Sequence, residues 1–190
     1  MTMTIQKPSF DEKKATGLAT YLLQLAGGTM NKMKLIKLMY LVDRASLCEM
    51  GQFVTNDDLY SLSFGPFLSH TADLINEQTE KPTLWSQYIT PPSKYNVSLI
   101  KKNNAKVQNC LSDYELELAQ KIYQQYGKMD KWALVDLLHK ILPEWEDPGK
   151  GNRKPIDIQK ILASCGKTPG EQKEIFVYLA EQAQVERFFQ

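Results

Sequence analysis

The sequence has few of the side chains that most often carry catalysis or bind metals. It contains two histidines, His70 and His139, and three cysteines, Cys48, Cys110 and Cys165. Neither histidine belongs to an HExxH motif, and no cysteine lies at ligand spacing from them, which argues against a zinc site. The glycine-rich motifs of phosphate-binding loops and the GxSxG motif of hydrolases are also missing. We therefore expect a protein that is not an enzyme and that uses no metal or cofactor.

Net charge and long hydrophobic runs are also lacking. The 23 basic and 22 acidic residues leave a net charge of +1, which gives no general attraction to nucleic acid or to a membrane surface. No apolar run approaches the roughly 18 residues that span a bilayer, and the first residues lack the apolar core of a signal peptide. The three cysteines are odd in number and widely spaced, so no disulfide framework is expected. These features predict a cytoplasmic protein in a reducing compartment.

The residues that are present suit one globular domain. The chain has 190 residues, of which 43% are hydrophobic and 24% are charged. That composition supports a real core. We predict a mainly α fold with a small antiparallel β-sheet or hairpin (α+β), arranged as a single compact helical domain.

Helix signals are spread along the whole chain. The most apolar predicted helix is "NKMKLIKLMYLVDRASLCEM", whose wide apolar stripe indicates packing on more than one side, and Gly51 ends it. Four other helices have an N-terminal cap in the sequence. The predicted caps are Ser9 with Glu12, Ser112 with Glu115, Asp130, and Thr168 with Glu171.

Strand signals lie between these helices. "DDLYSLSFG" alternates in the manner of a strand, and Gly65 and Pro66 follow it directly. Because Pro suits the first turn of a helix, we expect these two residues to join that strand to a helix. "WSQYIT" and "YNVSLIK" read as two further strands with a loop between them. The three strands together could form the small sheet.

A few polar side chains allow a functional and a structural interpretation. Cys48 could pair with His70 or His139 as a nucleophile, or it could be a buried small hydrophobe. His139 could act in acid–base chemistry or binding, and we favour a packing role that ties its helix end to the "PEW" turn. Acidic residues Asp57 and Asp58, and the acidic 144–147 segment, could bind a cation but are expected to be solvated.

Aromatic residues give the strongest hint of a binding surface. Trp85, Tyr88 and Tyr95 lie around the predicted hairpin. Aromatic side chains on a hairpin can anchor a protein interface, and they can equally stabilise a small sheet by cross-strand pairing. With the loop after Gly51 and the end of the hairpin included, the candidate interface consists of Phe53, Trp85, Tyr88, Tyr95 and Lys101.

The order of several short motifs resembles the Panacea antitoxin domain, also called the SocA-like antitoxin domain. That family has a K-L-x-K-L-x-Y helix followed by a glycine, a Thr-containing turn, an aromatic strand ending in Gly-Pro, and later a His and a Trp near a proline. The matching residues are Lys34, Leu35, Lys37, Leu38, Tyr40, Gly51, Thr55, Tyr60, Gly65, Pro66, His139, Pro143 and Trp145. The resemblance implies a lead-in over residues 1–17, the antitoxin domain over 18–166, and a C-terminal helix over 167–190 as a subfamily extension.

The resemblance implies an antitoxin that binds and neutralises a protein toxin encoded by a neighbouring gene. Such pairs are common on bacterial prophages and other mobile elements. One branch of the family presents its toxin to a cytosolic protease, so a protease is a second implied partner. Antitoxins also often repress their own operons, so a DNA-binding regulator of operator DNA is the alternative. Lys32, Lys34, Lys37 and Arg44 share one predicted helix, but no helix-turn-helix is visible. Homo-oligomerisation stays open.

Overall fold

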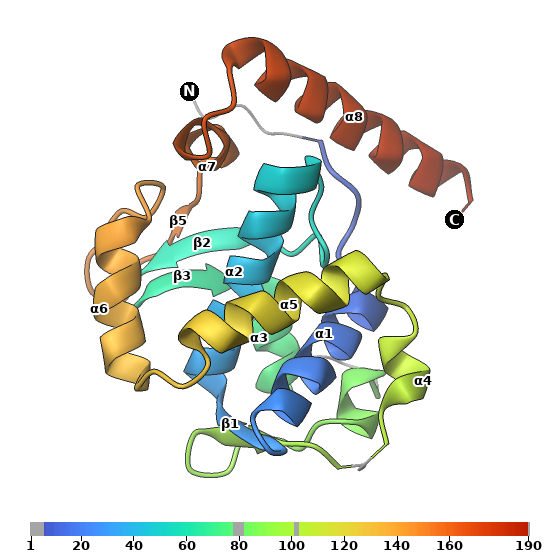
Figure 1. The fold of residues 1–190 in the computed structure, drawn as a ribbon, viewed down its shortest axis with the longest axis vertical. Helices are drawn as coiled ribbons and strands as arrows, with labels where there is room; N and C mark the ends of the chain where they lie inside the picture. Colours follow the sequence, from blue (N-terminus) through green and yellow to red (C-terminus); the bar gives the residue numbers. More distant parts are fainter. Residues whose placement is uncertain (1–5, 78–81, 101–102, 190) are drawn as a thin grey trace.

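Helix α2 (Lys32–Met50) runs through the middle of the molecule, and the other elements surround it (Figure 1). The computed structural model describes residues 6–77, 82–100 and 103–189. Helices α1, α4 and α5 gather on one side of α2, and a small sheet with α6 lies on the other. The other elements are α1 (Glu12–Leu25), β1 (Thr29–Asn31), β2 (Leu59–Leu62), β3 (Gly65–Leu68), α3 (Ser69–Ile75), the 3-10 helix η1 (Trp85–Gln87), β4 (Asn96–Ser98), α4 (Ala105–Gln108), α5 (Asp113–Tyr126), α6 (Lys131–Ile141), β5 (Lys154–Pro155), α7 (Ile158–Ser164) and α8 (Pro169–Phe188). The predicted mainly α class with a small antiparallel sheet is confirmed.

The central helix agrees with the prediction from its wide apolar stripe. Eleven of its 19 residues are buried, including the motif residues Leu35, Leu38 and Tyr40. Gly51 ends the helix in the left-handed conformation, with φ of 71°, and its N–H donates to the carbonyl of Leu47 at 3.0 Å. A helix that is buried on most sides fixes the position of every side chain that it carries.

The strands form two separate sheets, so the predicted grouping of the three strands into one sheet is wrong. Strands β3, β2 and β5 form one antiparallel sheet in that order, whereas β1 pairs with β4 in a two-stranded ribbon. The "WSQYIT" segment begins as the 3-10 helix η1, and its end meets the later strand segment through an isolated bridge between Ile89 and Leu99. The missed strand β1 has only three residues, too few to show a periodic pattern.

Gly65 and Pro66 form part of a β-hairpin, which corrects the predicted join from strand to helix. Gly65 follows the two-residue turn between β2 and β3 and has a positive φ of 99°. Pro66 pairs with Ser61, and it is tolerated because β3 is the edge strand of its sheet. The following helix, α3, begins three residues later at Ser69. Proline suits both situations, so its identity alone could not decide between them.

Three of the four predicted helix caps are confirmed. Ser112 with Glu115 and Thr168 with Glu171 form capping boxes, and the Asp130 carboxylate caps α6. The cap of α1 is different. Asp11 accepts the hydrogen bond from the N–H of Lys14 there, while Ser9 binds Glu186 of α8.

Two buried carboxylates organise the loop between α2 and β2. Asp43 accepts hydrogen bonds from the N–H groups of Val54 and Thr55 at 2.7 and 2.8 Å. Asp57 accepts from the N–H groups of His70 and Thr71, both at 2.8 Å, and so caps α3 from outside that helix. The expectation that Asp57 is solvated is therefore wrong, since this side chain is fully buried and hydrogen-bonded.

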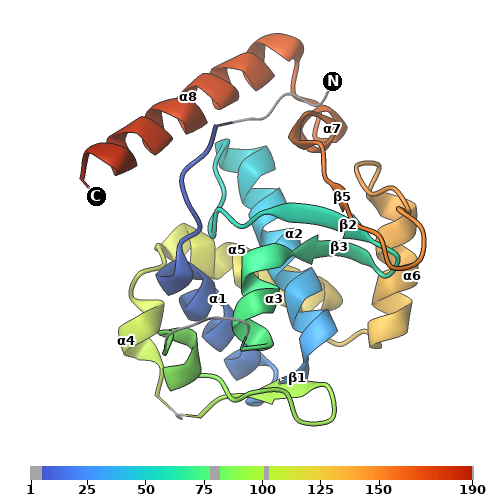
Figure 2. The same ribbon diagram turned by 180° about the vertical axis from the view of Figure 1, so that it is seen from behind.

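The C-terminal elements α7 and α8 lie at one end of the molecule, which Figures 1 and 2 both show. Helix α8 buries only Leu179 and Ala183. A disulfide between Cys48 and Cys165 joins the end of α2 to the end of α7. This bond contradicts the predicted lack of disulfides and the proposed Cys48–His pairs, and it removes the support that unpaired cysteines gave to a reducing compartment. Within the described ranges, no helix is both long and apolar enough to cross a membrane.

Candidate functional site

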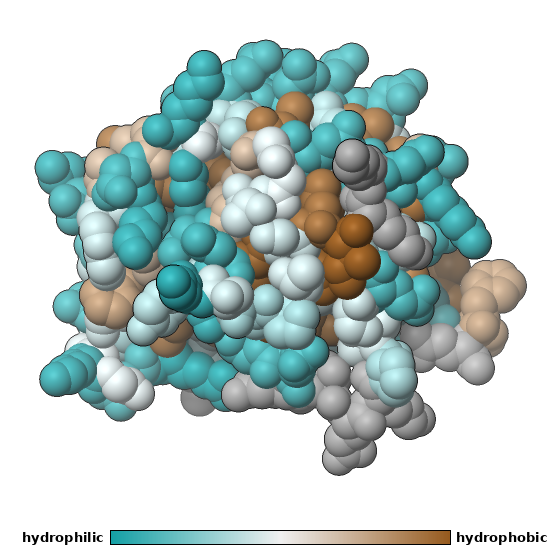
Figure 3. All heavy atoms as spheres, turned by 90° about the horizontal axis from the view of Figure 1, so that it is seen from below, coloured by the Kyte–Doolittle hydropathy of each residue, from teal (hydrophilic) through white to brown (hydrophobic). Residues whose placement is uncertain are grey.

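Most of the aromatic residues that were predicted to form an interface belong to the core. Phe53, Trp85 and Tyr88 are 5%, 2% and 7% exposed, so they cannot meet a partner in this conformation. Tyr95 is 71% exposed and remains available, and Lys101 lies outside the described residues. Figure 3 shows the end of the molecule that holds the β1–β4 ribbon. Teal and white residues cover most of this face, and its largest hydrophobic patch lies just right of the centre.

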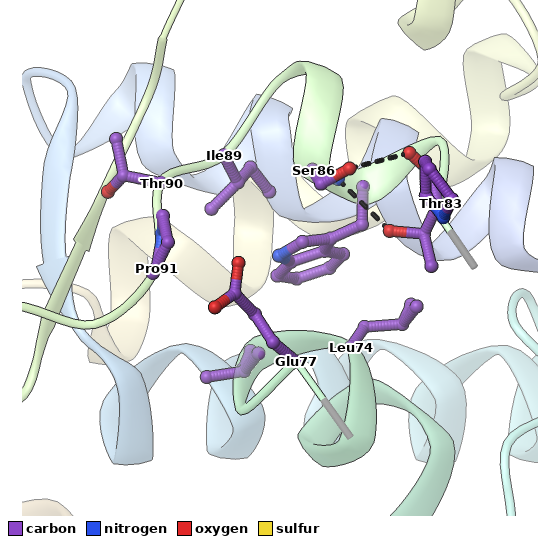
Figure 4. Close-up of a pocket in the computed structure, with 10 residues that line it drawn as sticks. Leu74, Glu77, Thr83, Ser86, Ile89, Thr90 and Pro91 are labelled. Atoms are coloured by element: carbon purple, nitrogen blue, oxygen red, sulfur yellow. Dashed lines mark hydrogen bonds between the residues drawn. The ribbon is translucent and has the colours of Figure 1, made fainter. Parts of the chain in front are cut away.

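The environment of Trp85 explains its burial. It lines a pocket of about 280 Å³ between the end of α3 and η1, into which Leu74 and Ile89 also point (Figure 4). Ser86 and Thr83 close one end of this pocket through two hydrogen bonds of 2.9 and 3.2 Å. The pocket therefore belongs to the packing of η1 against α3, and it brings no group of reactive side chains together.

Two side chains of α2 meet a carboxylate that lies far along the sequence. Tyr40 donates its hydroxyl to Glu144 at 2.8 Å, and Arg44 donates to the same carboxylate at 2.6 Å. Glu144 has a fully buried side chain, which corrects the expectation that it is solvated. Burial, and then the charge of Glu144, raise the pKa of Tyr40 well above its ordinary value. This network fixes the turn after α6 against the central helix.

The same turn positions an aromatic stack. The rings of His139 and Trp145 are nearly parallel, at 7°, with centroids 3.7 Å apart. Trp145 donates its indole N–H to the carbonyl of Leu62 in β2 at 2.9 Å. His139 thus ties the end of α6 to the "PEW" turn, as the favoured interpretation predicted. Its Nε2 atom is buried and has no hydrogen-bond partner in the described part of the chain.

Two motif lysines of α2 point to the carbonyl groups of neighbouring elements. Lys34 donates to the carbonyl of Met129 at 2.7 Å, and Lys37 donates to that of Pro66 at 3.3 Å. Lys32 donates to Asn76, and Arg44 is held by Glu144. The basic residues of this helix are therefore engaged within the chain and form no free face for reading DNA.

Lys37 is the most unusual of these groups because its side chain is buried. Only 3% of the residue is exposed, and burial lowers its pKa from 10.5 to about 8. His139 is also affected, since burial and the nearby Lys37 charge lower its pKa. The side chains of Lys37 and His139 thus lie close together, and each has a lowered pKa, which disfavours its positively charged form.

Gly65 lies directly against both groups. A Cβ atom on Gly65 would lie 3.0 Å from Lys37 Nζ and 3.6 Å from His139 Nε2. The positive φ and this close approach explain why glycine is required at the turn.

Gly65 also lines an apolar pocket of about 210 Å³, which we call the Gly65 pocket. Its mouth carries Phe64, which is 57% exposed and packs edge-to-face on Trp132 of α6, 48% exposed, at a centroid distance of 5.4 Å. Sequence reasoning missed both aromatics, although Phe64 directly precedes the motif glycine. The lining residues are Lys32, Met33, Ile36, Lys37, Leu62, Phe64, Gly65, Pro66, Phe67, Ile75 and Asn76.

The site offers little to a metal ion. No group of three or more His, Cys, Asp or Glu side chains is placed to hold one within residues 6–77, 82–100 and 103–189. Its chemistry consists of an apolar cavity, an exposed aromatic pair and a buried ammonium group. Such a combination suits recognition of another molecule.

Comparison with known proteins identifies the family. No curated protein sequence and no solved structure matches the chain. A family model described as "Antitoxin SocA-like, Panacea domain" matches residues 35–146, more than half of the chain. The match begins in α2 and ends just after Trp145, so it includes the Gly65 hairpin and the His139–Trp145 stack. The chain therefore belongs to the SocA-like Panacea antitoxin family.

Proposed function

We propose that this protein is an antitoxin that neutralises a protein toxin by binding it directly, without catalysing a reaction. The observation that carries the proposal is the family match over residues 35–146. The structure supports it because three motif residues, Lys37, Gly65 and Pro66, line a pocket beside the exposed Phe64.

The surface that suits this role best is the mouth of the Gly65 pocket. Phe64 and Trp132 expose about half of their side chains while packing against each other. Exposed aromatic residues beside a preformed cavity are typical anchors of protein interfaces. Phe64 belongs to the β2–β3 hairpin and Trp132 to the start of α6, and both elements pack against α2.

Growth of bacteria that express the neighbouring gene tests the function. We expect the gene product to arrest growth and this protein to restore it, with the two proteins copurifying. A decrease in the toxin level on coexpression, dependent on a cytosolic protease, would add delivery for degradation to the mechanism. If the neighbouring product is harmless, or if it is toxic and is neither bound nor neutralised, the proposal is wrong.

Paired alanine variants locate the interface in the same assay. Phe64→Ala with Trp132→Ala should abolish rescue while the thermal unfolding temperature stays close to that of the wild type. Tyr95→Ala is the matched control, because it removes an exposed aromatic residue at the β1–β4 ribbon. Loss of rescue only in Tyr95→Ala would move the interface to that ribbon.

A further inference from the structure

Lys37 carries a charge that the described structure leaves without an acidic partner. Its Nζ atom makes one hydrogen bond, to the Pro66 carbonyl, although an ammonium group has three donors. No carboxylate of the described residues lies within ion-pair distance of it, whereas Lys14, Arg44 and Lys154 all have such partners. A buried and unpaired ammonium group is unfavourable, and an anion that reaches it with good hydrogen-bond geometry removes that cost.

A second polar atom lies close to the Cβ position of Gly65. His139 Nε2 is buried without a partner, and the stack on Trp145 holds the ring in place. Both atoms surround the position that a side chain at Gly65 would fill. Two acidic residues influence His139, Asp136 and Asp147, and neither makes an ion pair with it in the described structure. A single Cβ atom would already fill this position, so an anion must approach Lys37 from the Gly65 pocket, which Lys37 lines.

The Gly65 pocket combines the ammonium group of Lys37 with apolar walls. Met33, Ile36 and Phe67 line it together with two lysines, and no Asp or Glu is among its described lining residues. The pocket is thus complementary to a negative charge combined with an apolar group. Its volume of about 210 Å³ is close to that of a single large residue.

These dimensions restrict the occupant. Because the pocket admits about one residue, the carboxylate and the apolar side chain must belong to the same residue. Only the C-terminal residue of a protein carries both groups. On the basis of the proposed function, we infer that the Gly65 pocket binds the C-terminal residue of the toxin, an apolar residue whose carboxylate pairs with Lys37 and whose side chain fills the apolar walls.

A small probe tests the pocket without the toxin. N-acetyl-L-phenylalanine has the carboxylate and an apolar side chain, and N-acetyl-L-phenylalanine amide lacks only the charge. In titrations followed by NMR of the Lys37 and His139 side chains, we expect the acid to bind at millimolar concentration and to raise the pKa of Lys37. The amide should bind at least tenfold more weakly.

Two variants serve as a matched pair for this titration. Lys37→Met keeps the length of the stem and removes the charge, whereas Lys140→Met removes an exposed charge from the helix that carries His139. The acid should lose at least tenfold in affinity for Lys37→Met and bind Lys140→Met like the wild type. Thermal unfolding confirms that both variants are folded. Absence of binding by the acid, equal binding of acid and amide, or unchanged binding to Lys37→Met would each overturn the inference.

Binding measurements with intact and truncated toxin distinguish this inference from the proposed function. Deletion of the last three toxin residues should weaken its complex with the wild-type antitoxin at least tenfold, and Lys37→Met should weaken the intact complex equally. If the truncated toxin binds unchanged, the terminal residue is not the occupant, and the antitoxin function stands. If the truncation has no effect but Lys37→Met does, an internal acidic side chain occupies the pocket, which also overturns the inference.

Discussion

Replacement of Gly65 by alanine tests both the backbone geometry of the hairpin and the space beside it. An L-residue at a φ of 99° is strained, at a cost of about 1–3 kcal/mol. The new Cβ would also lie 3.0 Å from Lys37 Nζ, so the ammonium group must move and lose its bond to Pro66. A hydrogen bond from a charged group is worth about 1.5–3 kcal/mol. We therefore expect a total loss of about 4 kcal/mol.

The two causes can be measured separately with a second glycine. Gly28 has a φ of 101°, and nothing lies within 4 Å of the Cβ that alanine would add there. Gly28→Ala should therefore lose only the backbone part, about 2 kcal/mol. For a chain of this size, 1 kcal/mol corresponds to about 2–4 °C in the unfolding temperature. Circular dichroism should then show a decrease of about 8–16 °C for Gly65→Ala and about half of that for Gly28→Ala.

A double-mutant cycle tests whether Lys37 causes the difference in stability loss between Gly65→Ala and Gly28→Ala. In a Lys37→Met background the contact atom is gone, so Gly65→Ala should cost the same as Gly28→Ala. Equal losses for the two single alanine variants would refute the reasoning about the space beside Gly65. No loss in either variant would refute the argument from the positive φ.

Three further predictions concern buried groups. The pKa of Lys37 is lowered to about 8 in the folded protein, so the unfolded chain binds more protons than the folded chain between pH 8 and 10.5. The free energy of unfolding of the wild type should therefore rise across that window by about 3 kcal/mol relative to Lys37→Met, as measured in denaturant titrations. Asp57→Ala uncaps α3 and removes the bonds to Thr71, so urea unfolding should show a loss of about 2 kcal/mol. Cys48→Ser removes the bond to Cys165, and calorimetry should show a loss of about 2–5 kcal/mol.

Residues of the same type at other positions supply the controls for two of these measurements. Asp58→Ala alters an exposed carboxylate and should leave the stability almost unchanged, and so should Cys110→Ser, which removes a thiol that is not in a disulfide. A Lys37→Met profile parallel to that of the wild type above pH 8 would contradict the assigned pKa. An Asp57→Ala variant as stable as Asp58→Ala would contradict the capping role, and a Cys48→Ser variant as stable as Cys110→Ser would show that the disulfide contributes nothing.

The helices could be predicted from the sequence because their signals are local. The cap at Ser112 and the terminating Gly51 act within one turn of their own helix, and the structure has both. The hairpin could not be predicted, since Pro66 fits an edge strand and a first helical turn equally well. Only the pairing of β3 with β2 decides between them, and that pairing depends on residues elsewhere in the chain.

The order of the short motifs in the sequence identified several residues of the candidate site, but it did not predict the environment of their side chains. The motif pointed to Lys37, Gly65 and His139, which do meet in space. Their burial depends on tertiary packing that brings α6 and the hairpin to α2. The same reason explains the errors for Glu144 and Trp85, a charged and an aromatic residue that both lie inside the fold.

The Gly65 pocket divides its residues into a buried floor and an exposed mouth, and the two parts differ in their tolerance of mutation. Gly65 has a positive φ and lies against Lys37 inside the fold, so most substitutions of Gly65 disturb the fold itself. Phe64 and Trp132 contact each other and solvent, and surface substitutions of this kind usually change stability little. Under the proposed function, the sequence of the mouth is free to diverge toward new partners while the floor keeps one chemistry, so that a single scaffold can acquire different specificities through few changes.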